Sequence, residues 1–194
     1  MGKAHPKEEM TFLMIKPDGV QRGLIGEIIT RVERAGLKVV AIEMYQATKE
    51  EMDKHYPKEE AWITRLGHKS LATYEKYGYD PIEEMGTAKA EEIGPHVRRW
   101  LIDYMSSGPI VKIVVQGVHA VDMVRKIRGN TQPVLSEMGT ITGDFSADSA
   151  AAANKDKRAI YNLAHASETP EEAAHEIEHW DMKKKIHKYK RMDE

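Results

Sequence analysis

The sequence predicts an α+β sandwich, a single domain in which helices pack on one face of an antiparallel sheet. Short apolar runs typical of strands alternate with segments whose apolar residues recur at helical spacing. The 194 residues, 41% hydrophobic and 31% charged, are enough for one sizeable core. Cysteine is absent, which excludes disulfide scaffolds, iron–sulfur proteins, cysteine nucleophiles and thiolate zinc sites.

The first predicted strand is the apolar run 11–15, which the segment KPDG at 16–19 closes as a turn. Apolar residues then recur at helical spacing over 25–32, and Gly36 supplies a C-terminal stop. A second apolar run, 37–44, predicts the next strand. The chain therefore begins strand, helix, strand.

The middle of the chain is helical and highly charged. Thr48 and Glu51 have the spacing of a capping box, so we expect a helix to begin after Thr48. Residues 57–98 combine charged helical stretches with glycine and proline breaks, and we interpret them as a helical insertion on the compact fold. The helical pattern recovers over 97–105.

The second half returns to the alternation. Residues 109–115 are the most strand-like segment of the chain, and 120–127 predict a short helix. Residues 129–158 are rich in Gly, Thr, Ser, Ala and Asp, and we expect an extended, irregular loop there. Loops this long inside a compact domain are usually functional. The run 159–164 predicts the last strand.

A strong helix start follows the last predicted strand. Thr169 is a cap, Pro170 suits the first helical position, and Glu172 closes a capping box. His165 is thus expected between a strand and a helix N-terminus. We expect one domain over 1–180 and a charged, solvated tail over 181–194.

Charge and hydropathy limit the partners. The chain has 29 Lys plus Arg against 31 Asp plus Glu, a net charge of −2, so no global field attracts nucleic acid or anionic lipid. No apolar run approaches the roughly 20 residues of a membrane helix, and the first residues lack a signal-peptide core. We expect a cytoplasmic protein with no membrane partner and no nucleic acid partner.

The first candidate site surrounds His165. A neutral imidazole is a competent nucleophile near neutral pH, and the N–H groups of the following helix attract anions such as phosphate. Glu176, eleven residues later, is placed to orient the ring. Asn162 and Ser167 offer neutral hydrogen bonds. The alternative is a histidine without a functional role.

The second candidate site combines cationic side chains from distant segments of the chain. Lys16 follows the first strand, and Arg125, Arg128 and Thr131 lie around the start of the long loop. Cations and a hydroxyl brought together from distant segments would suit a polyphosphate. The alternative is that each of these side chains is simply solvated.

A third candidate is the zinc motif H-E-x-x-H, which His175, Glu176 and His179 satisfy on a predicted helix. The continuation of one zinc-protease class would require glycine at 182 and histidine at 185, where this chain has Met182 and Lys185. We therefore expect both histidines on the solvated side of the helix.

Taken in order, these segments closely resemble the nucleoside diphosphate kinase family. The matching segments are KPDGVQRGLIGEI at 16–28, HY at 55–56, SGP at 107–109, GNTQP at 129–133, GTITGDF at 139–145 and NLAHASETPEEAAHEI at 162–177. The resemblance implies a ferredoxin-like βαββαβ sandwich and a ping-pong transfer of phosphate from a nucleoside triphosphate to a diphosphate with Mg²⁺. It also implies a homo-oligomer, a hexamer or a tetramer.

The resemblance assigns roles residue by residue. His165 is the residue transiently phosphorylated, and Glu176 and Ser167 support it, with Lys16 as a further catalytic group. The positions that match phosphate and sugar contacts are Lys16, Tyr56, Arg125, Thr131 and Asn162, and Thr142 stands at a further substrate-binding position. No metal ligand from the protein is implied.

The chain departs from the family pattern at two places. The family usually has an arginine where this chain has Thr142, and we expect Arg158 or Lys157 in the longer loop to restore that charge. The family's aromatic base platform aligns near Val97, which predicts aliphatic stacking and weak discrimination among bases. A catalytically weak nucleotide-binding or scaffold protein of the same fold remains the alternative.

Overall fold

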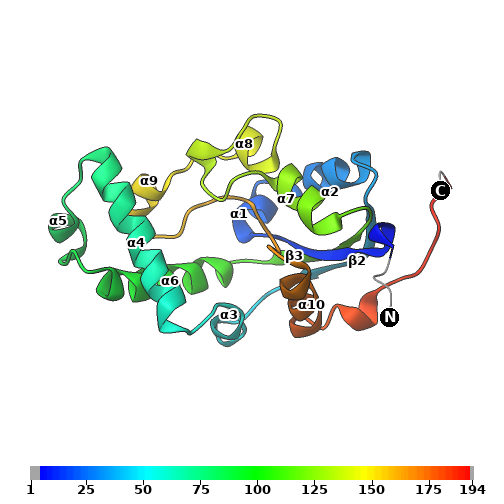
Figure 1. Ribbon diagram of the computed structural model, residues 1–194, viewed down its shortest axis with the longest axis horizontal. Helices are drawn as coiled ribbons and strands as arrows, with labels where there is room; N and C mark the ends of the chain where they lie inside the picture. The colour runs from blue at the N-terminus through cyan, green and yellow to red at the C-terminus, as the bar shows by residue number, and fades with distance from the viewer. Residues whose placement is uncertain (1–4, 193–194) are drawn as a thin grey trace.

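The computed structural model describes residues 5–192 and places a four-stranded antiparallel sheet at the centre of the molecule (Figure 1). The strand order is β2–β3–β1–β4. The strands are β1 (Met10–Ile15), β2 (Lys38–Tyr45), β3 (Ile110–Gln116) and β4 (Ala164–Ala166).

Ten α-helices and three short 3₁₀ turns connect and cover these strands in the described part of the chain. They are η1 (Pro6–Glu8), α1 (Pro17–Gln21), α2 (Ile25–Arg34), α3 (Lys49–His55), α4 (Glu60–Tyr77), α5 (Pro81–Met85), α6 (Ala90–Met105), α7 (Ala120–Arg128), η2 (Pro133–Leu135), α8 (Ile141–Phe145), α9 (Ala150–Lys155), α10 (Pro170–His179) and η3 (Lys183–Lys185). None of these helices combines the length and apolar character needed to cross a membrane.

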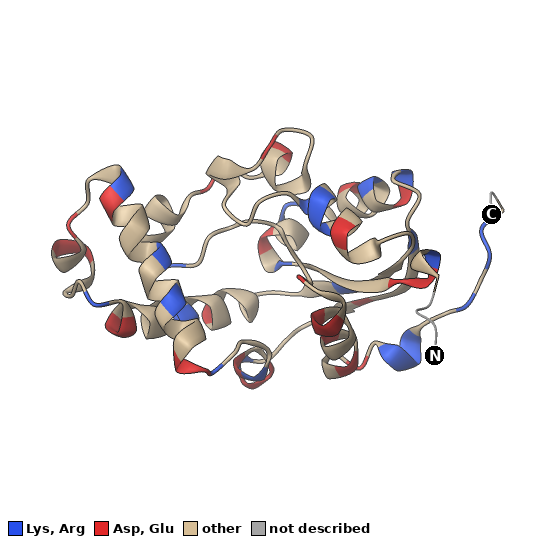
Figure 2. Cartoon of the chain, in the orientation of Figure 1, with Lys and Arg blue, Asp and Glu red and all other residues tan. Residues whose placement is uncertain are grey.

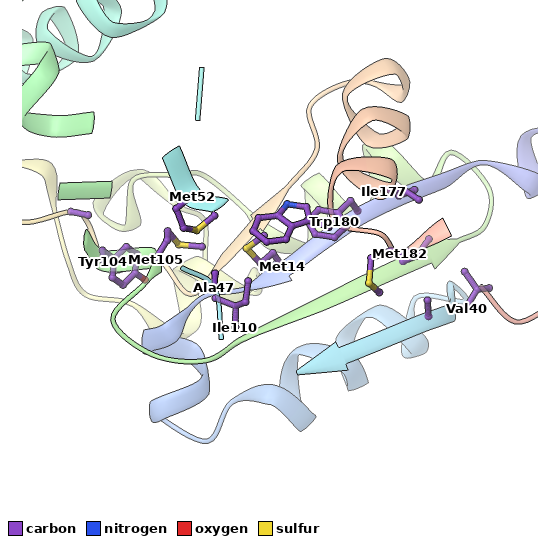
Figure 3. Close-up of a cluster of buried hydrophobic side chains, with 14 of the residues drawn as sticks. Met14, Val40, Ala47, Met52, Tyr104, Met105, Ile110, Ile177, Trp180 and Met182 are labelled. Atoms are coloured by element: carbon purple, nitrogen blue, oxygen red, sulfur yellow. The ribbon is translucent and has the colours of Figure 1, made fainter. Parts of the chain in front are cut away.

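Helices cover both faces of the sheet, whereas the sequence pattern predicted them on one. Alternate residues of β1 point to opposite faces, so Leu13 and Ile15 pack with α2 and α7 in one cluster. Phe12 and Met14 join the other cluster, which includes Trp180 and residues of α3, α6 and α10 (Figure 3). The sheet is therefore the middle layer of the molecule.

Two local predictions were wrong. The segment after β1 is not a turn: Pro17 is the first residue of helix α1, where its fixed φ suits helix geometry. The last strand is Ala164–Ala166 rather than 159–164. Leu163 has φ of 69°, so its backbone cannot continue an extended strand. His165 consequently lies within β4, opposite Met14.

The capping box at Thr48 and Glu51 is confirmed and begins α3. At α10, Thr169 caps the helix by accepting from the Glu172 N–H, as predicted. The Glu172 carboxylate, however, accepts from the Glu168 N–H at 2.5 Å instead of closing the box on Thr169.

Helices α4 and α6 form a close pair that extends to one side of the sheet (Figure 1). They approach through glycine: a Cβ at Gly67 would lie 1.9 Å from the Ala90 carbonyl oxygen, and one at Gly94 would lie 2.2 Å from that of Ile63. Residues 57–98 remain our interpretation of the insertion, and they end within α6.

The long loop, 129–158, contains the short helices α8 and α9. Helix α9 packs against α4. Lys155 is the last residue of α9, and its Nζ lies 3.0 Å from Glu84 Oε1.

The C-terminal tail follows the outer edge of β2 instead of extending freely into solvent. The His187 N–H donates to the Val40 carbonyl at 2.8 Å, and the Tyr189 hydroxyl donates to that of Val39 at 2.7 Å. Lysine residues crowd this tail and acidic residues occupy α10 (Figure 2). The last two residues of the predicted tail, 193 and 194, lie outside the described residues.

Candidate functional site

His165, Glu176 and Ser167 form one hydrogen-bonded chain at the boundary of β4 and α10. His165 Nε2 lies 2.7 Å from Glu176 Oε1, and Ser167 Oγ donates to Glu176 Oε2 at 2.6 Å. Glu176 and Ser167 are buried, whereas the His165 side chain is 26% exposed. The predicted grouping of these residues is thus present in the structure.

Glu176 fixes the state of the His165 ring. Burial alone raises the pKa of the Glu176 carboxyl, but the hydrogen bonds from His165 and Ser167 outweigh it, so its pKa lies below the usual value. An ionised carboxylate can only accept, so Nε2 carries the proton in the neutral ring. The lone pair of a neutral His165 is therefore on Nδ1, the nitrogen that Glu176 does not use.

A second hydrogen-bonded chain joins Lys16, Asn162 and Thr131. Lys16 Nζ donates to Asn162 Oδ1 at 2.7 Å, and Asn162 Nδ2 donates to the Thr131 carbonyl at 2.6 Å. Burial lowers the pKa of Lys16 from 10.5 to about 8. The backbone of Lys16 also donates to the Leu163 carbonyl at 2.8 Å, which ties this chain to the residues just before β4.

Asp18 holds the segments around Lys16 in place. Its carboxylate accepts from the Tyr104 hydroxyl, from the Gly19 N–H at 2.9 Å and from the Leu163 N–H at 3.1 Å. Sequence reasoning did not assign Tyr104 any role. It is 86 residues from Asp18 in the chain, so no local pattern signals the contact.

His55, which the sequence did not indicate as a site residue, lies against the His165 ring. The centroids of the His55 and His165 rings are 5.6 Å apart, and His55 Nε2 is 3.9 Å from Glu176 Oε1. Burial and the neighbouring His165 lower the pKa of His55 to about 3, so it stays neutral. The HY segment at 55–56 contains this histidine, but the family resemblance gives a role only to Tyr56, whose ring contacts that of His55.

Three buried polar atoms near the end of α7 have no hydrogen-bond partner. They belong to Arg125 (Nη1), Arg128 (Nε) and Thr142 (Oγ1). The only ion pair of Arg125 among the described residues is a 3.7 Å contact with Glu168, whose side chain is 72% exposed. Buried donors are normally satisfied, and an anion that accepts from several of them would satisfy this group.

The remaining predicted residues occupy other surroundings. Arg158 is bound through two nitrogens to Asp148, at 2.6 and 3.1 Å, and by Nε to Asp156 at 3.1 Å. Its charge is thus already matched by two carboxylates. Lys157 is exposed, with φ of 53°, and Val97 packs against the Trp180 cluster.

The zinc motif does not converge on a metal site in the described residues. His175 is exposed and His179 stacks on His55 with ring centroids 6.0 Å apart. Glu176 turns inward to His165 and Ser167 instead of toward the two histidines of the motif. The expectation that both histidines lie on the solvated side holds for His175 but is wrong for the half-buried His179.

Comparisons with known proteins agree with this geometry. The sequence model of the nucleoside diphosphate kinase family matches residues 9–67 and 90–186. A nucleoside diphosphate kinase of Pyrobaculum aerophilum is 47% identical over 172 residues, covering 89% of this chain and 94% of that protein.

Solved structures give the same result. The crystal structure of an NDP kinase from Pyrobaculum aerophilum superposes with a TM-score of 0.89 at 43% identity and covers 93% of this chain and all of its own. A transition state mimic of the Borrelia burgdorferi nucleoside-diphosphate kinase, with bound vanadate and ADP, has a TM-score of 0.76 at 34% identity and covers 97% and 96% of the two chains. The four-stranded order and the helices on it are therefore the fold of these enzymes, and this chain belongs to the nucleoside diphosphate kinase family.

Proposed function

We propose that this chain transfers the γ-phosphate of a nucleoside triphosphate to a nucleoside diphosphate by a ping-pong mechanism through phosphorylated His165. The observation that carries the proposal is the hydrogen bond between His165 Nε2 and the buried Glu176 carboxylate, in a chain of this family. That bond leaves Nδ1 as the nucleophile.

In the first half-reaction, the Nδ1 lone pair of His165 attacks the γ-phosphorus. The bond from that phosphorus to the β,γ-bridging oxygen breaks, and its electrons leave with the nucleoside diphosphate. In the second half-reaction, a terminal β-phosphate oxygen of another diphosphate attacks the same phosphorus, and the N–P bond breaks back to Nδ1. Glu176 keeps its hydrogen bond to Nε2–H throughout and stabilises the positive charge on the ring.

Cationic and neutral donors position the phosphates. We assign this role to Lys16, Arg125, Thr131 and Asn162, and to Tyr56, whose ring contacts that of His55. A loose transition state for phosphoryl transfer depends on positioning and on neutralisation of charge. The Lys16–Asn162–Thr131 chain and the Arg125 nitrogen that lacks a hydrogen-bond partner supply both.

Mg²⁺ would enter with the nucleotide, as part of the substrate. In the described part of the chain, His55, His165 and Glu176 are the one group of three His, Asp or Glu side chains whose ligand atoms lie within 4.8 Å of one another. Mg²⁺ prefers oxygen ligands and is commonly held through substrate phosphates and water. Two imidazoles do not suit it, so the donors present do not fit a protein-held Mg²⁺.

The same geometry favours an enzyme over the alternative of a nucleotide-binding scaffold. A scaffold has no chemical need for a buried carboxylate hydrogen-bonded to both an imidazole and a serine. We test the proposal with His165→Ala, and with His68→Ala as a control because His68 is an exposed histidine on α4. In an ATP–GDP exchange assay, His165→Ala should lose all activity and His68→Ala should retain it. Substantial turnover by His165→Ala would contradict the proposal.

We also propose a cytoplasmic homo-oligomer, a hexamer or a tetramer. Strand β2 is at the edge of the sheet and exposes Ile42 and Met44 at 50% and 58%. Exposed apolar side chains of this size on one edge favour burial against another subunit. Light scattering should give a mass of four or six chains, and a monomer would contradict this assembly.

A further inference from the structure

Arg128 is a buried arginine with an unmatched charge. It is 7% exposed, and its Nε has no hydrogen-bond partner. Glu168 is the opposite charge that acts on it, but that carboxylate is itself exposed and pairs with Arg125 at 3.7 Å. Buried charges are normally paired or bound to a ligand, because burial without a partner is costly.

The surroundings of Arg128 add further positive charge. Burial and the nearby Arg125 guanidinium lower the pKa of Arg128, and Arg128 in turn helps to lower that of Lys16. Asp18, the acidic group close to Lys16, already accepts three hydrogen bonds. Three cations from α7 and the end of β1 therefore lie close together with little negative charge to balance them.

Thr142 lies on the helix that meets the end of α7. A Cβ on Gly129, the residue after Arg128, would lie 2.4 Å from Thr140 Oγ1 at the start of α8. Thr142 is fully buried in α8, with its hydroxyl oxygen unpaired. The resemblance to the family implies an arginine at this position. Arg158, the replacement expected from the sequence, is bound to Asp148 and Asp156 instead.

We propose that Arg128 binds the phosphate chain of the nucleotide and supplies the positive charge that Thr142 lacks. The proposal rests on the proposed function, because it concerns the same nucleotide site. A guanidinium presents its donors as a planar fork that matches two phosphate oxygens. The neutral Thr142 and the buried Arg128 then belong to one phosphate-binding site.

Calorimetric titration with ADP and with adenosine tests this directly. Arg128→Leu should raise the Kd for ADP at least tenfold and leave the Kd for adenosine within twofold, since only ADP carries phosphate. Lys126→Leu is the matched control, because it removes one positive charge from an exposed position of the same helix and should change neither. An unchanged ADP affinity in Arg128→Leu, or an equal loss for adenosine, would overturn the proposal.

Stability without nucleotide separates phosphate binding from a structural role. Because Arg128→Leu removes a buried unmatched charge, its Tm without nucleotide should equal or exceed that of the unchanged chain. A lower Tm together with an unchanged Kd for ADP would assign Arg128 a purely structural role and overturn the proposal. Should Arg128→Leu fail to fold, Arg128→Lys gives the same test: it keeps the charge but loses the fork, so ADP affinity should fall while Tm is retained.

A rescue variant completes the design. Adding Thr142→Arg to Arg128→Leu should restore ADP affinity, and failure to restore any affinity would contradict a shared role for the two positions. Labelling of His165 by ATP in the unchanged chain is scored separately. Labelling together with unaltered ADP affinity in Arg128→Leu would refute the Arg128 assignment alone. No labelling, together with weakened ADP affinity in Arg128→Leu, would refute phosphoryl transfer alone.

Discussion

Replacing Glu176 by glutamine should slow phosphorylation of His165 about tenfold while leaving the fold intact. In the structure the Glu176 carboxylate accepts from His165 Nε2 at 2.7 Å and from Ser167 Oγ at 2.6 Å. Glutamine has nearly the same shape and keeps one acceptor oxygen, but it carries no charge. The perturbation therefore removes mainly the electrostatic part of the contact.

The magnitude follows from the kind of hydrogen bond that is lost. A hydrogen bond to a charged group contributes about 1.5–3 kcal/mol, and a neutral one about 0.5–1.5 kcal/mol. The midpoints of these ranges differ by about 1.3 kcal/mol. This difference applies as the ring becomes positive, and ~1.4 kcal/mol corresponds to a tenfold change in rate. Ser167→Ala should have a smaller effect, because Glu176 keeps its charge and its bond to His165.

Rapid-quench measurement of phosphohistidine formation from labelled ATP is the appropriate assay. Glu178→Gln is the matched control, since Glu178 lies on the same helix but its side chain is 67% exposed and pairs with Lys183. It should react at the unchanged rate. If Glu176→Gln also reacts within twofold of the unchanged chain, the carboxylate does not stabilise charge on His165 and the reasoning fails.

Four further predictions follow from the structure. Burial lowers the pKa of Lys16 to about 8. Between pH ~8 and ~10.5, Lys16 is therefore protonated in the unfolded chain but largely neutral in the folded chain, and its contribution to the free energy of unfolding rises with pH. Lys16→Met should therefore raise the free energy of unfolding by up to about 3 kcal/mol at pH 7 and by little at pH 10 in urea titrations, and an equal gain at both would contradict this. Gly94→Ala should lower Tm, because its Cβ would lie 2.2 Å from the Ile63 carbonyl oxygen. The control Gly26→Ala, whose Cβ meets nothing within 4 Å, should leave Tm unchanged or raise it. A similar Tm for both variants would count against the tight α4–α6 crossing. His175→Ala should retain exchange activity within twofold, and a zinc-dependent loss would revive the zinc motif. The kcat/KM values for GDP and CDP should agree within about tenfold, and a larger ratio would show that base edges are read.

Local signals in the sequence predicted local structure well. The capping box at Thr48 and Glu51 and the proline at the start of α10 specify helix starts through contacts within four residues. The order of strands and helices also followed from periodicity. The last strand was misplaced because its position depends on pairing with β1, and the left-handed backbone at Leu163 has no sequence signal.

The candidate site shows the same division. The spacing from His165 to Glu176 predicted that the two side chains meet, and they are hydrogen-bonded in the structure. Contacts between distant segments, such as that between Tyr104 and Asp18, were invisible in the sequence. Arg158 has the positive charge that a replacement would need, but in the structure the Asp148 carboxylate pairs with it. The role of a charged residue depends on the side chains that surround it as well as on its type, and these neighbours are known only from the fold.

The proposed mechanism requires one nitrogen of His165 to hold the phosphoryl group between two nucleotides. Single-turnover labelling tests it most directly: the chain is mixed with Mg²⁺ and ATP labelled at the γ-phosphate, separated from free nucleotide, and mapped by mass spectrometry. We predict one acid-labile phosphate at residue 165, which is released as labelled GTP when GDP is added. A protein that carries no label, or a label elsewhere that GDP cannot discharge, would contradict the account.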